Sequence, residues 1–179
     1  MQHLGLVSFL IFFIGLLVTV TKLPGGLHLT FSQRVAHRKK VKILYSLLFI
    51  VGLSILYLFF KLWLVPTKHL PLAFLLFAAI SIFFQVACTF IPEEGGTKTL
   101  IHRLLTGISG AALLPLMIIL MTSQTINTSL RVITGVSLIL MLFLLIVALA
   151  NQKGFKYALL LQIGYYAIFF CSILLVTYG

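Results

Sequence analysis

Two adjacent glutamates, Glu93 and Glu94, are the only carboxyl side chains in the 179-residue sequence, which contains no aspartate. A short turn with two glycines separates them from His102 and Arg103. A carboxylate, an imidazole and a guanidinium at one place can bind a phosphate or a metal ion, or move a proton. Glu93, Glu94 and His102 are therefore the candidate catalytic residues. The alternative is that the glutamates are solvated loop charges and that His102 and Arg103 anchor a helix end.

The scarcity of acidic groups excludes several classes of enzyme. Glycosidases and two-metal enzymes need carboxylates from separated segments, whereas both carboxylates here share one turn. A Walker-type ATPase is excluded, because the sequence lacks both the phosphate-binding loop and an aspartate for magnesium. One histidine beside two glutamates offers too few ligands for a zinc site. No histidine falls in the middle of an apolar segment, where a haem would need it. We expect neither a metal nor a cofactor.

The elements that position these residues are predicted from the apolar runs of the sequence. Hydrophobic residues make up 61% of the chain and charged residues only 8%. A helix needs about 20 apolar residues to cross a hydrocarbon core of about 30 Å. Six runs have about that length, which predicts an all-α polytopic membrane protein, with residues 1–179 forming a single domain of six transmembrane helices. The predicted spans are 4–21, 43–64, 72–91, 101–121, 131–150 and 157–178.

The distribution of Lys and Arg predicts how these spans are oriented. Ten of these residues lie in or beside the first, third and fifth loops, and three lie on the other side. Short loops rich in Lys and Arg stay in the cytoplasm, so both termini are predicted to lie outside. The net charge of +11 then indicates contact with anionic lipid head groups. We do not expect nucleic-acid binding, because no folded basic domain is left to carry it.

The first loop has a local pattern that predicts a further helix. Thr30 and Gln33 fit a capping box, and we expect the helix they open to run unbroken into the second span. Arg34, Arg38 and Lys42 would then share one face. This face either contacts lipid or only determines the topology. The candidate contacts to anionic lipid are Arg34, Arg38, Lys39, Lys40 and Lys42.

Polar residues within the spans mark a candidate binding site, because polar groups in hydrocarbon are costly without partners. Counted at about 1.5 Å per residue, Gln85 and Gln162 lie at similar depths from the predicted cytoplasmic side. They could bond each other or a shared ligand, or they could simply join helices. The candidate ligand-binding residues on the third, fourth and sixth spans are Gln85, Gln162, Thr89, Thr106 and Arg103.

The fourth span also carries small residues at helical spacing. Gly107 and Ala111 are four residues apart, which allows another helix to approach closely. This face predicts a homo-oligomer or another helix-packing partner.

One short motif suggests a family. The segment from Phe90 through Pro92 to Glu94, followed by His102, resembles the six-span membrane family known as domain of unknown function 998. The resemblance implies an integral protein of the prokaryotic cytoplasmic membrane, from a family without an established activity.

Three functions are consistent with these observations. The first is a protein that binds or handles a small molecule or lipid at a cytoplasmic-side site. The second is a membrane enzyme that uses Glu93 or Glu94 with His102 as acid and base on a lipid head group. The third is a structural or assembly subunit that packs through the Gly107–Ala111 face.

Overall fold

The computed structural model describes residues 1–36, 38–91, 93–150 and 156–179, and this part of the chain is helical without strands. Its elements are α1 (His3–Lys22), α2 (Phe31–Ala36), α3 (Lys39–Phe59), the π-helix η1 (Phe60–Leu64), α4 (Val65–Thr67), α5 (Leu72–Phe90), α6 (Gly96–Thr122), α7 (Thr128–Ala150) and α8 (Ala158–Tyr178). The prediction of an all-α bundle with six transmembrane helices is confirmed. The chain is an integral membrane protein.

The six long helices have the length and the surface that a bilayer requires. They contain 19 to 28 residues, with α3, η1 and α4 forming one continuous helix over Lys40–Thr67. At a rise of about 1.5 Å per residue these helices are about 28–42 Å long. Large apolar side chains such as Leu76, Phe83 and Phe143 are exposed on the outside. Such a surface is stable only against lipid, because in water it would expose a contiguous apolar area.

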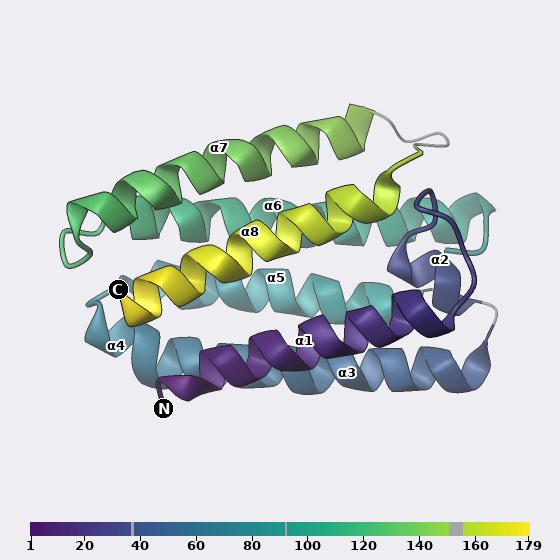
Figure 1. The fold of residues 1–179 in the computed structure, drawn as a ribbon, viewed down its shortest axis with the longest axis horizontal. Coiled ribbons are helices and arrows are strands. Elements are labelled where there is room, and N and C mark those ends of the chain that lie inside the picture. The colour runs from purple at the N-terminus through teal and green to yellow at the C-terminus, as the bar shows by residue number, and fades with distance from the viewer. Residues whose placement is uncertain (37, 92, 151–155) are drawn as a thin grey trace.

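The long helices form a ring in the order of the chain. Each packs against the next one, and α8 returns to contact α1. In Figure 1, α1, α7 and α8 lie nearer the viewer than α3, α5 and α6. Both termini lie at one end of the bundle and α2 lies at the other (Figure 1). We call these the terminal end and the α2 end.

Aromatic side chains fill the centre of the ring. The ring of Phe12 on α1 lies 5.1 Å from Phe49 on α3 and 5.7 Å from Phe170 on α8, measured between centroids. Phe60 meets Phe74 of α5 at 5.2 Å, edge to face. Aromatic pairs in these geometries add about 0.5–1.5 kcal/mol each beyond their buried area. They connect helices that are far apart in the sequence.

The second span departs from a regular α-helix at η1. A π-helix contains more residues per turn than an α-helix, so the chain beyond it is rotated about the helix axis. As a result the consecutive residues Phe59 and Phe60 are both buried, together with Leu64. The apolar run of the sequence did not reveal this insertion.

The capping box of the first loop is confirmed. The amide N–H of Thr30 donates to Oε1 of Gln33 at 2.9 Å, and the amide of Gln33 donates to Oγ1 of Thr30 at 3.3 Å. The prediction of one unbroken helix into the second span is wrong, because α2 ends at Ala36 and α3 begins at Lys39. Arg34 and Lys42 therefore do not share a helical face.

Arg34 is turned inward, so its predicted contact with lipid is also wrong. Its guanidinium is buried and donates to four backbone carbonyls of the preceding loop, those of Leu23 at 3.1 Å, Gly25 and Gly26 at 2.8 Å, and Leu29 at 3.4 Å. A side chain at Gly25 would approach this group, since a Cβ there would lie 3.2 Å from Cζ of Arg34. The physical reason for the correction is that loop carbonyls at the membrane surface need donors, and a guanidinium supplies several.

The Arg34→Met variant is expected to lower the free energy of unfolding by about 3 kcal/mol, because it removes charge-assisted hydrogen bonds and leaves carbonyls without donors. Arg38→Met, which removes an exposed cation from the same segment, should change it by less than about 0.5 kcal/mol. Unfolding in mixed detergent micelles measures both. Equal effects would show that the loop does not depend on Arg34.

Candidate functional site

The predicted acid–base residues lie at the α2 end, where the turn between α5 and α6 meets the first loop. Glu93 is buried there, with 9% of its surface exposed. Its Oε1 accepts a hydrogen bond from Nε of Arg103 at 2.9 Å, and its Oε2 accepts one from Oγ1 of Thr30 at 3.0 Å. The carboxylate thereby joins the start of α2 to the first turns of α6.

Glu94 has a different environment from its neighbour. It is exposed, and its Oε2 lies 3.3 Å from Nζ of Lys98, four residues along the chain. A pair of this kind on a helix surface contributes little, about 0.3–0.5 kcal/mol. The expectation that a glutamate is a solvated loop charge therefore applies to Glu94 and not to Glu93.

His102 completes the C-terminal turn of α5. The side chain is buried, and its Nδ1 lies 3.0 Å from the carbonyl oxygen of Cys88 and 2.7 Å from that of Ile91. Since both partners are acceptors, Nδ1 carries the proton. The last carbonyls of a helix lack intrahelical partners, and His102 supplies a donor for two of them.

The glutamates and His102, which would act as acid and base in the enzyme hypothesis, therefore contact different partners. Within residues 1–36, 38–91, 93–150 and 156–179, neither glutamate pairs with His102. The same part of the chain brings no three His, Cys, Asp or Glu side chains together as a metal site. The observed contacts at this turn hold the fold together.

The two glutamines do not form the single site that their depth suggested. Oε1 of Gln162 accepts from the backbone amide of Phe31 at 3.3 Å, at the start of α2. Oε1 of Gln85 accepts from Oγ of Ser109 at 3.1 Å and from the hydroxyl of Tyr166 at 2.8 Å. Depth along a helix axis was estimated from the sequence, but the direction around the axis was not. The candidates therefore separate into a group at the α2 end and a group inside the bundle.

The threonine candidates bond to their own helices. Oγ1 of Thr106 donates to the carbonyl of His102 at 2.9 Å, and Oγ1 of Thr89 donates to that of Val86 at 2.8 Å. Such bonds satisfy a hydroxyl inside a membrane helix without a partner from another helix. Thr89 also lines the pocket described next.

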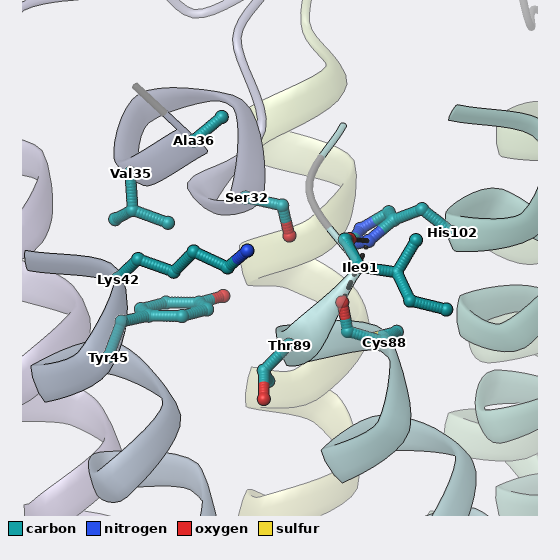
Figure 2. A pocket seen from close by; sticks show the side chains of 9 residues that line it. All are labelled: Ser32, Val35, Ala36, Lys42, Tyr45, Cys88, Thr89, Ile91 and His102. Carbon is teal, nitrogen blue, oxygen red and sulfur yellow. Dashed lines mark hydrogen bonds between the residues drawn. The ribbon is translucent and has the colours of Figure 1, made fainter. Parts of the chain in front are cut away.

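A small pocket opens at the α2 end between α2, α3, α5 and α6. Figure 2 shows the Lys42 side chain extended beside the ring of Tyr45, with its amine directed towards Ser32 and the centre of the pocket. The cavity volume is about 10 Å³, which is room for about one water-sized group. The lining residues are Ser32, Val35, Ala36, Lys42, Tyr45, Cys88, Thr89, Ile91 and His102.

Lys42 is a charged residue of the pocket whose amine has no bonding partner among the described residues. It is half-buried, and its amine makes no hydrogen bond or ion pair with any residue that the structure describes. Sequence analysis placed it among lipid contacts of the loop and did not include Ser32 or Tyr45 among the candidate site residues. The spacing of Lys42 and Tyr45, three residues apart on one helix, was the available signal, whereas nothing in the sequence indicated Ser32.

The other predicted lipid contacts lie at the same end. Arg38 and Lys40 are exposed where α3 begins, at the level expected for head groups. The side chain of Lys39 lies outside the described part of the chain. Contact with anionic lipid stays a prediction for these residues.

The small-residue face of α6 points away from the bundle. Ala111 is exposed, and a Cβ placed on Gly107 would have no neighbouring heavy atom within 4 Å. The close approach inside the bundle uses Gly110 instead, whose carbonyl accepts from the hydroxyl of Tyr165 at 2.6 Å. A helix-packing partner on the Gly107–Ala111 face therefore stays a prediction.

Comparison of the chain with models of known families, with curated proteins and with solved structures gave no match. The resemblance to domain of unknown function 998 is neither supported nor opposed by these comparisons.

The Glu93→Gln variant is expected to lower the free energy of unfolding by about 1–2 kcal/mol, because it replaces the ion pair with the half-exposed Arg103 guanidinium by a hydrogen bond to a neutral amide oxygen. Glu94→Gln is the matched control, with an expected change below about 0.5 kcal/mol. Thermal unfolding of the purified variants compares them. A Glu94 effect as large as that of Glu93 would contradict the structural role assigned to Glu93.

Proposed function

We propose that this integral membrane protein binds an anionic phosphate group, that of a lipid head group, in the pocket at the α2 end. The observation that carries the proposal is the amine of the half-buried Lys42, which has no partner among the described residues and points into the pocket (Figure 2).

The chemistry of the pocket favours an oxyanion. An ammonium withdrawn from water is costly unless an anion or acceptors surround it. The hydroxyls of Ser32 and Tyr45 stand beside the Lys42 amine and can donate to the same oxygen. Ammonium and hydroxyl donors around one point are typical of a phosphate contact.

The size and position of the pocket favour a lipid over an enclosed soluble ligand. A volume of about 10 Å³ accepts a single oxygen, so the rest of the ligand stays outside. Both glutamates are engaged by Arg103 and Lys98, which leaves an excess of positive charge at this end of the bundle. Each exposed cation near an anionic leaflet adds about 1 kcal/mol of attraction.

The positive-inside bias places the α2 end in the cytoplasm and both termini outside. With the resemblance noted above, the proposal assigns the protein to the cytoplasmic membrane of a prokaryote. The enzyme alternative has less support, since Glu93 and His102 each hold structural groups and do not meet.

Lys42→Met is expected to weaken binding of dioctanoyl phosphatidylglycerol about tenfold or more, the worth of a hydrogen bond to a charged group. Lys40→Met removes the same charge from the exposed surface two residues away and should cost about fivefold at most. Calorimetric titration of protein in phosphatidylcholine nanodiscs measures both affinities.

Equal losses in the two variants would contradict the pocket and leave only a general surface attraction. Inorganic phosphate is titrated in parallel. Binding of phosphate as tight as that of the lipid would identify a soluble anion as the ligand instead of a head group.

The orientation has its own test in intact cells. Lys40→Cys and Gln124→Cys each place a thiol at an exposed site, at the α2 end and in the loop between α6 and α7 respectively. Cys171, which is exposed, is replaced by alanine, while Cys88 is buried and stays. A membrane-impermeant maleimide is expected to label Gln124→Cys at once and Lys40→Cys only after permeabilisation. The reverse pattern would overturn the orientation.

A further inference from the structure

A second cavity lies further along α5 than the head-group pocket, towards the middle of the bundle. It is lined by residues of α3, η1, α5, α6 and α8 and has a volume of about 30 Å³, room for about two water-sized groups. Its polar lining residues are Ser81, Gln85, Ser109 and Tyr166. The remaining walls are apolar, formed by residues such as Leu56, Leu113 and Phe169.

The hydrogen bonds around the cavity leave one donor group without a partner. Oε1 of Gln85 already accepts two bonds, from Ser109 and from Tyr166. Oγ of Ser81 donates to the carbonyl of Ser109 at 2.9 Å. The amide nitrogen of Gln85 makes no hydrogen bond to any residue that the structure describes, although only 5% of the residue's surface is exposed.

An unsatisfied amide within a membrane bundle has a cost of about 1–3 kcal/mol. Gln85 lines the cavity, so an acceptor placed there within reach of its amide would remove the cost. The acceptor is neutral, because the polar lining contains no charged side chain and a bare anion at this depth would be strongly disfavoured.

One wall of the cavity includes the point where the second span departs from regular geometry. Phe60, the first residue of η1, lines the cavity. Single π-helical turns inside α-helices are frequent at functional sites. One polar end and an apolar body are the usual composition of a pocket for a small molecule.

We propose that this cavity binds a neutral, membrane-dissolved molecule through a carbonyl or similar acceptor, which takes its hydrogen bonds from the amide of Gln85. The cavity holds the acceptor end, and the apolar side chains around it contact the first part of the hydrocarbon body. The site is independent of the proposed head-group pocket, from which it differs in charge and in depth.

Acetophenone and ethylbenzene are the probes, because they share size and shape and differ in a single carbonyl. Protein in phosphatidylcholine nanodiscs is titrated with each, and binding is followed by thermal stabilisation. Acetophenone labelled with ¹³C at its carbonyl reports the hydrogen bond by its chemical shift. Acetophenone is expected to bind more tightly than ethylbenzene, with a shifted carbonyl resonance.

Gln85→Leu should weaken acetophenone binding about three- to tenfold, the worth of one neutral hydrogen bond, and leave ethylbenzene unchanged. Gln162→Leu is the matched control, since its glutamine bonds to Phe31 at the α2 end. It should change neither affinity. If Gln85→Leu does not fold, Ala78→Val narrows the cavity from a buried position and keeps the amide. That variant should bind neither acetophenone nor ethylbenzene.

Equal affinity for the two probes, or an unshifted carbonyl resonance in the wild-type protein, would overturn the proposal. So would the absence of binding by either probe, which would identify water as the acceptor for Gln85.

Discussion

The bonds between the Arg34 guanidinium and the carbonyls of the first loop determine the structure of the whole α2 end. These bonds fold the loop that precedes α2 around one side chain of α2, and so hold the short helix at this end of the bundle. Thr30 then reaches Glu93, and Ser32 faces the pocket. The underlying constraint is that backbone groups near hydrocarbon need partners inside the protein. One cation meets this need for four carbonyls of the loop.

The same constraint explains how the few strongly polar side chains are used. Glu93 accepts a hydrogen bond from the hydroxyl of Thr30 in the first loop. His102 donates to a carbonyl at the end of α5, and Gln162 accepts from the amide of Phe31 at the start of α2. Among the described residues, the amine of Lys42 and the amide nitrogen of Gln85 make no hydrogen bond, and each belongs to a residue that lines a cavity. One is a cation at the α2 end, and the other is a neutral donor within the bundle. They therefore select ligands of different chemistry.

Sequence analysis was successful where a property depends on distance along the chain. Apolar length predicted the six spans, and the spacing of Thr30 and Gln33 predicted the start of α2. It failed where a property depends on the direction in which a side chain points from its helix. Arg34 was assigned to a lipid-facing stripe because an unbroken helix was assumed, and Gln85 was grouped with Gln162 because depth alone does not say which way a side chain points. The Lys42 pocket needs residues from four helices, a juxtaposition that no local pattern contains.

The π-helix of the second span has a consequence for how the chain length of this region can vary. Its extra residue is accommodated within the apolar span, while Leu64 at its end and Leu70 beyond it stay buried. A relative without that residue would continue as a regular α-helix through the same region. An alignment of the two would then show a single-residue gap within a membrane span, at 60–64, and both neighbouring loops would keep their lengths.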